Sequence, residues 1–416
     1  MAEAPPPIKV PPLAWSGDTA LDLTFPAGWE VVPCLMQGHN APRLTEEQHR
    51  RAFADPIGCP PLRELARGKK RVAVLFDDLS RPTKAYQIVP YVLEELAAGG
   101  VGAESIQFIC ALGAHGALTS ADFRRKLGDD IVARFRVYNH DPFGHCVPVG
   151  TTTRGTPVQL NAAFAEADLK VGIGTILPHH MIGFSGGAKI VLPGVASIET
   201  IRHNHLTLPP KAQAGGAETA WGVAQCDGNA MFLDVQDARR LAGLDVKVDA
   251  LVNGRCDTAA LFVGEPAAEH AAGIQRARRH YLTPRVDSPQ VVVANANAKA
   301  TEAGLALGRA VELLPDEGGA VVLIASSPLG EVPHYVYGHF GDAVAGHLDL
   351  PTLAPKIRKL VVHMPWPDKA LLSHLGPPDA IHVARTWPEV ILALKQECRD
   401  GARVAVIPDG TMQYFG

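Results

Sequence analysis

Two adjacent histidines stand ahead of a glycine-rich turn that ends in a lysine, in the stretch PHHMIGFSGGAKIVLPG (178–194). A glycine-rich turn before a lysine suggests phosphate binding. The P-loop pattern, however, needs Gly-Lys-Ser/Thr at the start of a helix, and here Lys189 is followed by isoleucine. An ordinary nucleotide triphosphate site is therefore not indicated. Lys189 could be solvated, could bind another kind of phosphate, or could be a point of covalent attachment.

Further polar residues follow strand-like segments. Asp77, Asp78 and Arg81 lie in DDLSRPT, directly after one such segment. They could form a capped turn with an ion pair. Alternatively, Arg81 could bind a substrate carboxylate through two hydrogen bonds, the task that the planar guanidinium suits best. His115 follows the next segment, in a loop before a helix start.

Four more histidines form two close pairs. His179 and His180 are adjacent, so they cannot both face one site from a regular strand, and we expect one to act and the other to pack. His203 and His205 are two apart, which suits zinc in a strand but makes the side chains diverge on a helix. Because Ser197 is a candidate helix cap, we expect a single functional histidine here.

The segments around these residues alternate between strand-like and helix-like, which predicts an α/β fold with largely parallel sheets. Strands are expected within 71–78, 105–115 and 167–180, and each hands polar residues to a loop at its carboxyl end. Ligands bind outside the carboxyl ends of strands in open α/β sheets, so a site is expected there. The segment 84–100 predicts a helix that Pro90 kinks.

The turn-rich stretch TPRVDSP (283–289) predicts a domain junction. Residues 1–284 are expected to form one α/β domain and 285–405 a second, with the site in the cleft between them. A second series of βα segments supports this division: strands within 290–297, 319–326, 359–365, 380–385 and 402–408, and a helix over 299–314. The tail, 406–416, is assigned no regular structure.

Composition narrows the class of protein. The chain has 416 residues, 47% of them hydrophobic, and a net charge of −4, which argues against a nucleic-acid partner. No apolar run approaches the roughly 18 residues of a membrane helix. The start MAEAPPPIKVPPL lacks the pattern of a secretory signal and predicts an extended arm. Seven scattered cysteines without a CxxC pair indicate reduced thiols and a cytoplasmic protein.

Taken in order along the chain, the patterns DDxxRPT, GxH, PHxxxGFSGGxKxxxPG and HNH resemble those of the nickel-dependent lactate racemase family, and the resemblance spans nearly the whole sequence. It implies an isomerase that racemises or epimerises a small 2-hydroxy acid, lactate-like or short-chain aliphatic. It further implies a nickel-pincer nucleotide cofactor, covalently attached, and partner proteins that synthesise it and insert nickel. No side chain accepts hydride, so this cofactor would take it reversibly and leave a 2-keto acid.

The resemblance also implies roles for individual residues. Those facing the substrate would be the acid–base histidines His115 and His179, with Asp78 and Arg81 beside them. Those holding the cofactor would be Lys189 through a thioamide, Ser185, Gly186 and Gly187 in the turn at its phosphate, Trp387 nearby, and His205 as the nickel ligand. The roles of His180, His203 and Lys299 and the oligomeric state stay open.

The sequence departs from the lactate-specific pattern at two places. Gly116 follows LGAH where the family commonly has arginine, and Ala303 and Ala306 align with a glutamine and a lysine that face the substrate. Lys299 and Glu302 are nearby but not clearly equivalent. These departures affect the identity of the substrate more than the type of reaction.

Two other functions remain possible from the sequence. One is a zinc-dependent hydrolase that uses His179, His203 and His205 with Asp78, although no HExxH or comparable spacing supports it. The other is a non-enzymatic protein that carries nickel or a nucleotide on the same fold.

Overall fold

The structure is a computed structural model that describes residues 3–11, 14–15, 17, 19–208, 220–337, 341, 353–398 and 401–416. They divide into two compact units. The first unit comprises Ala41–Arg279 and Pro333–Gly346, and the second comprises Met1–Asn40, His280–Val332 and His347–Gly416.

A six-stranded sheet forms the centre of the first unit. Its strands, from edge to edge, are β13 (Thr258–Gly264), β12 (Val246–Val252), β9 (Leu169–Thr175), β4 (Val72–Phe76), β5 (Ile106–Cys110) and β6 (Arg136–Asn139). All neighbours are parallel except β12 and β13. The expected parallel α/β arrangement is therefore present, with one antiparallel edge.

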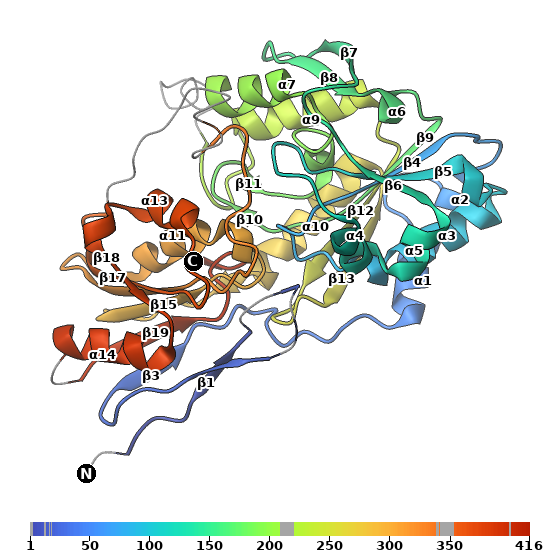
Figure 1. Ribbon diagram of the computed structural model, residues 1–416. Coiled ribbons are helices and arrows are strands. Elements are labelled where there is room, and N and C mark those ends of the chain that lie inside the picture. Colours follow the sequence, from blue (N-terminus) through green and yellow to red (C-terminus); the bar gives the residue numbers. More distant parts are fainter. Residues whose placement is uncertain are drawn as a thin grey trace. The chain divides into compact units, whose positions relative to one another are not determined.

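Alternation along β4 shows how this sheet is covered on both faces. Val72, Val74 and Phe76 belong to one apolar cluster, while Ala73 and Leu75 belong to another. Successive side chains of a strand point to opposite faces, so each cluster is one side of the sheet. Helices contribute to the first cluster from α1 (Glu46–Ala54), α2 (Leu62–Leu65), α3 (Val89–Ala98), α4 (Ser120–Leu127) and α5 (Asp129–Arg134), and to the second from α6 (Ala162–Ala165), α7 (Ile198–Arg202) and α9 (Ala230–Ala242) (Figure 1). A further helix, α10 (Pro266–His280), follows β13.

The second unit has its own six-stranded sheet, in which every neighbouring pair is parallel. Its strands, from edge to edge, are β18 (Ile381–Ala384), β17 (Ile357–His363), β16 (Gly319–Ile324), β15 (Val291–Asn295), β19 (Arg403–Ile407) and β3 (Glu30–Pro33). One face packs against α11 (Gly304–Leu313) and α13 (Lys369–Leu375), and the other against α14 (Trp387–Glu397).

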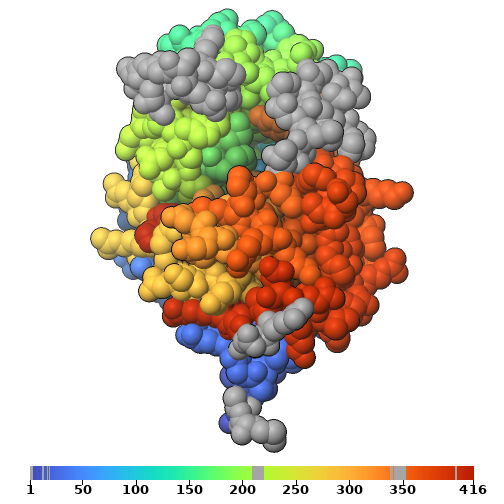
Figure 2. All heavy atoms as spheres, turned by 90° about the vertical axis from the view of Figure 1, so that its left-hand side faces the viewer, coloured from blue at the N-terminus to red at the C-terminus, as the bar shows by residue number. Residues whose placement is uncertain are grey.

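The compact units differ from the contiguous domains expected from the sequence. Residues before Ala41 join the later unit, because β3 forms backbone hydrogen bonds with β19. In both views the blue N-terminal residues accordingly lie beside the orange and red ones (Figures 1 and 2). Because β3 and β19 are far apart in the sequence, no local pattern of residues predicts that they pair.

The two chain ends also carry short strands. In the N-terminal arm, β1 (Ile8–Val10) pairs with β2 (Leu21–Leu23). The tail was expected to lack regular structure, and this is wrong, because β20 (Tyr414–Phe415) pairs with β14 (Leu282–Thr283). Two-residue strands depend on tertiary pairing and cannot be recognised by periodicity.

Local predictions near the site have mixed outcomes. The strands expected within 71–78, 105–115 and 167–180 are present as β4, β5 and β9. The kink at Pro90 is wrong: α3 begins at Val89, so the proline lies in the first turn, where its missing N–H removes no helical hydrogen bond. Two hairpins were not expected: β7 (Cys146–Thr151) with β8 (Pro157–Asn161), and β10 (Pro178–His179) with β11 (Gly183–Phe184).

Candidate active site

The carboxyl ends of three adjacent parallel strands meet in the first unit. Strand β4 lies between β9 and β5. Asp77 and Asp78 directly follow β4, His115 lies in the loop after β5, and His179 lies in the hairpin after β9. The sequence placed these residues at strand ends, and the sheet order explains why they come from neighbouring strands.

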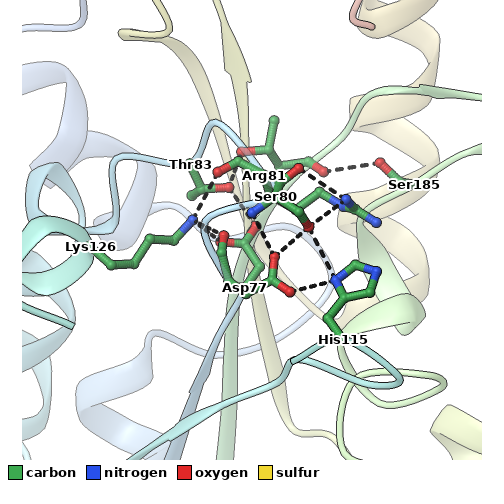
Figure 3. Close-up of polar contacts among 9 residues, drawn as sticks. Asp77, Ser80, Arg81, Thr83, His115, Lys126 and Ser185 are labelled. Carbon is green, nitrogen blue, oxygen red and sulfur yellow. Dashed lines mark hydrogen bonds and ion pairs between the residues drawn. The ribbon is translucent and has the colours of Figure 1, made fainter. Parts of the chain in front are cut away.

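Asp78 and His115 form a buried hydrogen-bonded pair. Nδ1 of His115 lies 2.6 Å from Oδ2 of Asp78 and 3.3 Å from Oγ of Ser80 (Figure 3). The backbone N–H and hydroxyl of Ser80 both donate to the other carboxylate oxygen of Asp78. Burial raises the pKa of Asp78, but His115, Arg81 and Ser80 together lower it below its ordinary value. Asp78 is therefore a carboxylate that orients His115.

Asp77 has a different partner and a different role. The ammonium of Lys126, a fully buried side chain on α4, lies 2.7 Å from Oδ1 of Asp77 and donates to the carbonyls of Asp78 and Arg81 (Figure 3). Thr83 donates to the other oxygen of Asp77. These contacts fix the loop that carries Asp78. The ion pair considered for this turn thus exists, but with Lys126.

Arg81 lies beside the Asp78–His115 pair. Its guanidinium donates to the carbonyl oxygen of Ser80 at 3.0 Å and to the hydroxyl at 2.8 Å. Its positive charge is one of the contributions that lower the pKa of Asp78. A cation that close to the proposed base suits the binding of an anionic substrate.

His179 and Lys189 are brought into contact by the hairpin β10–β11 and the turn after it. Nε2 of His179 lies 3.0 Å from Nζ of Lys189. Nδ1 of His179 accepts hydrogen bonds from the backbone of Met181 at 3.2 Å and Ile182 at 3.4 Å. The ring of His180 is exposed and stacks on that of His179, with centroids 4.8 Å apart. His179 thus faces the lysine, and His180 packs against it.

The turn before Lys189 needs its glycines because of packing inside the protein. Gly186 and Gly187 have positive φ, and a Cβ on Gly187 would lie 2.3 Å from the ring of His270. The N–H of Gly187 donates to Asp249 at 2.6 Å, and the ring of His270 donates to the carbonyl oxygen of Ser185. The N–H of Gly187 therefore has a partner already, and contact of this turn with a phosphate stays a prediction.

His205 is a buried, uncharged imidazole. It follows α7, which Ser197 caps as expected, in a single π-helical turn over His203–Thr207. Burial, the largest cause, lowers the pKa of His205 to about 3, with a smaller opposing effect of the Ile201 carbonyl. Its Nδ1 is buried and makes no hydrogen bond of normal geometry with the described residues. A neutral imidazole with an unsatisfied nitrogen has the form that a metal ion binds.

His203, in contrast, is used by the fold. Its Nδ1 lies 2.8 Å from the hydroxyl of Thr156, and the neighbouring Asn204 donates to Asp234. Among the described residues, no group of three histidine, cysteine, aspartate or glutamate side chains is placed to hold a metal ion. The zinc site considered from the sequence would need such a group.

Known proteins place this constellation in a family. Residues 16–215 match the family model of the lactate racemase N-terminal domain. The lactate racemase of Lactiplantibacillus plantarum is 28% identical over 405 residues, which cover 89% of this chain and 91% of that protein. The lactate racemase of Thermoanaerobacterium thermosaccharolyticum is 29% identical over 235 residues, covering 55% of this chain and 53% of that protein. The chain is thus similar to lactate racemases over most of its length, and its residues 16–215 match the N-terminal domain of that family.

Solved structures agree on the fold. The lactate racemase apoprotein from T. thermosaccharolyticum superimposes with a TM-score of 0.70 at 20% identity, covering 99% of this chain and all of that one. A protein from Thermotoga maritima gives a TM-score of 0.65 at 18% identity, with 90% and 99% covered. The predictions of the α/β fold, of the lactate racemase family and of an isomerase are confirmed.

Other residues that the family resemblance singled out belong to the second unit. The indole N–H of Trp387 donates to the carbonyl oxygen of Thr24 at 2.8 Å, and its ring packs edge-on against Phe25. Ala303 and Ala306 are buried in the apolar cluster with α11. A role of Trp387 beside the cofactor stays a prediction.

Several residues of the site were not predicted from the sequence. The ring of His334 lies 5.2 Å from that of His115, and the hydroxyl of Tyr337 donates to the carbonyl oxygen of His205. Lys126 holds the loop after β4 through Asp77, and Asp249 holds the turn before Lys189 through the N–H of Gly187. The segment PHYVY (333–337) resembles the start of PHHMI (178–182), and this was the only available signal. Within the described residues, no helix is long and apolar enough to cross a membrane.

Proposed function

We propose that this protein racemises or epimerises a short 2-hydroxy acid such as lactate. The observation that carries the proposal is the contact between His179 and Lys189, 3.0 Å apart, in a unit that also holds the Asp78–His115 pair. An acid–base histidine is thereby next to the lysine that the family resemblance makes the attachment point of the cofactor. The relatives named above are lactate racemases, which supports the reaction type.

The residues present fit the nickel-pincer nucleotide, Ni(II) pyridinium-3,5-bisthiocarboxylic acid mononucleotide. His205 offers an uncharged, buried imidazole whose Nδ1 makes no normal hydrogen bond within the described part of the chain. Lys189 is half-buried on a turn that Asp249 holds. We propose that Lys189 attaches the cofactor and His205 binds its nickel. When bound, the cofactor would supply the hydride acceptor that no side chain can provide.

The chain's own residues would bind the substrate and move its hydroxyl proton. Arg81 would hold the carboxylate, and Nε2 of His115 would take the hydroxyl proton as hydride leaves the adjacent carbon. Asp78 would stabilise the resulting imidazolium, because its pKa is held low. The 2-keto acid would then turn, so that the hydride would return to its other face, and His179 is the candidate that would give a proton back to its oxygen.

We further propose that the substrate has a short or apolar side chain and that the cofactor is made and loaded by dedicated synthesis and nickel-insertion proteins. Arg81 would hold the carboxylate without the second cation of the family pattern, which Ala306 replaces. A dicarboxylate such as malate should be a poor substrate. Relative kcat/KM for lactate, longer 2-hydroxy acids and malate tests this, and a clear preference for malate would contradict it.

The decisive experiment uses protein produced together with the cofactor-synthesis proteins. Each pure lactate enantiomer is added, and formation of the opposite enantiomer is measured beside the intact mass of the protein. We expect both conversions and a covalent adduct on Lys189. Protein made without the synthesis proteins is the control and should show neither. An adduct-bearing protein that converts no 2-hydroxy acid in either direction would refute the proposed function.

A further inference from the structure

The two proposed acid–base histidines have opposite hydrogen-bond partners at the same ring nitrogen. Nδ1 of His115 faces a carboxylate oxygen of Asp78 at 2.6 Å. A carboxylate only accepts hydrogen bonds, so Nδ1 of His115 must carry the proton. In a neutral ring the lone pair is then on Nε2, which points away from Ser80 (Figure 3).

His179 has the reverse arrangement. Its Nδ1 faces the backbone N–H groups of Met181 at 3.2 Å and Ile182 at 3.4 Å. A backbone N–H only donates, so Nδ1 of His179 must carry the lone pair. In a neutral ring the proton is then on Nε2. In a doubly protonated ring, the N–H at Nδ1 would point at these two backbone N–H groups, which are themselves donors.

Two placements of the protons can account for the contact between His179 and Lys189, and only the first agrees with the amide contacts at Nδ1. Nε2 of His179 lies 3.0 Å from Nζ of Lys189, which requires one proton and one lone pair between them. If Nε2 carries the proton, the lysine contributes the lone pair as an uncharged amine. If the lysine is an ammonium group that donates to Nε2, the ring proton must move to Nδ1. There it would face the two backbone N–H groups that already point at this nitrogen.

The same geometry occurs a second time in the first unit. His334 also follows a proline, and its Nδ1 accepts from the backbone of Val336 and Tyr337, both at 3.2 Å. In both cases the donors are the amides two and three residues after the histidine. The amide contacts at His179 thus belong to a local turn that occurs twice in the unit. The backbone geometry of this turn does not depend on a lysine partner.

We propose that the protein holds His115 and His179 in opposite tautomers, with His115 presenting a lone pair at Nε2 and His179 presenting an N–H. Asp78 is the positioning residue for the first, and the amides of residues 181 and 182 position the second. His334, whose ring is 5.2 Å from that of His115, shares the tautomer of His179.

The catalytic consequence rests on the proposed function. His115 is ready to accept a hydroxyl proton, whereas His179 must first lose the proton on Nε2 before it can accept another. Until then, His179 can stabilise a substrate oxygen as a neutral hydrogen-bond donor. The two enantiomers would therefore enter the reaction from unequal states of the enzyme, although the overall equilibrium between them stays even.

The test reads the tautomers directly in the cofactor-free full chain. Ring-¹⁵N-labelled histidine is incorporated, and nitrogen–proton correlations of the rings are recorded by NMR. The seventeen histidines are reduced to the relevant signals by comparison with His115→Gln, His179→Gln and His334→Gln, each of which removes one set. We expect the protonated nitrogen to be Nδ1 in His115 and Nε2 in His179 and His334.

Two further variants separate the causes. Lys189→Met removes the lysine contact and should leave the His179 pattern unchanged, because the amides set it. Asp78→Asn should alter the His115 pattern and leave that of His179 as it is. The proposal is overturned if His179 is protonated at Nδ1 or at both nitrogens, or if its pattern reverses in Lys189→Met. Neither result depends on racemase activity, so failure of the proposed function would be recognised separately by the lactate assay.

Discussion

Both units place polar side chains at the carboxyl ends of a six-stranded, largely parallel sheet, but they use them differently. In the first unit, Asp78 after β4 is hydrogen-bonded to His115 after β5, side chain to side chain. In the second unit, Asp409 after β19 accepts from the backbone of Ala298 and from the backbone and hydroxyl of Thr411. Only the first pairing connects two groups that can exchange protons with a ligand.

The charge states of the two aspartates diverge for the same reason. Burial raises both pKa values, but His115 and Arg81 provide cationic partners that lower that of Asp78 overall. The described donors to Asp409 are N–H and hydroxyl groups, and burial raises its pKa to about 6. A carboxylate beside a histidine thus stays ionised to low pH, whereas the other one takes up a proton at a higher pH.

Two further strand ends in the second unit follow the pattern of Asp409. Asn295, the last residue of β15, donates to the carbonyl oxygen of Pro408. His363, the last residue of β17, is bonded through Nδ1 to the carbonyl oxygen of Ala384. Position at a strand end is therefore not enough to identify a site. The partner distinguishes the two regions: backbone groups and non-titratable side chains in the second unit, another titratable side chain in the first.

The largest expected effect comes from Lys189. Replacing it with alanine should abolish both the covalent adduct and racemisation, while the protein stays folded, because the turn is held by Asp249 rather than by the lysine. Lys189→Arg is the matched control that keeps a long polar side chain without a nucleophilic amine, and it should also lack the adduct. Intact mass and circular dichroism check both variants. An adduct retained in either one would end the attachment assignment.

Loss of nickel should be separable from loss of the adduct. In His205→Ala the organic part of the cofactor should remain on Lys189, because its attachment does not involve the imidazole. Nickel should be absent, since the buried neutral ligand is gone. Metal analysis and intact mass of one preparation decide this. Full nickel content in the variant would show that His205 is not the ligand.

Histidine replacements test whether only the first of the two sheets supplies reacting groups. His115→Gln and His179→Gln should each reduce racemisation by at least ~10²-fold, the low end of general acid–base contributions. His363→Gln, at a strand end of the second unit, should reduce thermal stability and leave kcat of the folded protein nearly unchanged. Steady-state rates on both enantiomers, normalised to folded protein, test this. Comparable losses in all three would mean that the second sheet also supplies reacting groups.

The sequence predicted the parts of this arrangement that depend on local apolar runs. The central strands β4 and β15 are buried along their whole length, and β5 and β9 are buried except at their second residue, so each stands out as a largely apolar segment. The helix start expected after His115 is capped by Thr119, and Ser197 caps α7 as expected; both side chains accept a backbone hydrogen bond. Such features need only neighbouring residues.

Features that depend on distant residues were not predicted. Lys126 lies among charged residues in FRRKL, and nothing local shows that its ammonium is buried against Asp77. His334 reaches His115 from more than 200 positions away in the chain, through an isolated backbone pairing. The placement of β3 beside β19 has the same origin. The candidate histidines could be identified from motifs, but their hydrogen-bond partners and tautomers required the structure.

A smaller and more selective effect is expected from Asp78→Asn. The amide can no longer hold the proton on Nδ1 of His115 through a charge, so the imidazolium formed during proton uptake loses its stabilisation. We expect oxidation of the enantiomer served by His115 to slow by on the order of 10²-fold and that of the other enantiomer to change little. Single-turnover measurements of keto acid with each pure enantiomer test this. Equal slowing of both would indicate that Asp78 shapes the whole site.

The smallest expected effect concerns folding rather than the reaction. The pKa of Asp409 is raised to about 6 in the folded protein from 3.8, so the folded state binds its proton more tightly than the unfolded state does. The resulting contribution to stability is present below about pH 4 and is lost as pH rises through about 6. Two pH units correspond to about 3 kcal/mol at most. Asp78, with its lowered pKa, contributes with the opposite sign and loses its contribution as pH falls.

Asp409→Asn should remove this particular dependence. The difference in unfolding free energy between the natural chain and Asp409→Asn should shift in favour of the natural chain as pH is lowered from 6.5 to 4. Asp379→Asn, at an exposed position of the same unit, should give a difference that does not change with pH. Urea unfolding at several pH values measures both. Because the two variants lie in one unit, a pH-independent difference for Asp409→Asn would mean that its backbone and hydroxyl donors keep this carboxylate ionised, and the contrast with Asp78 would then lie only in which groups they bond.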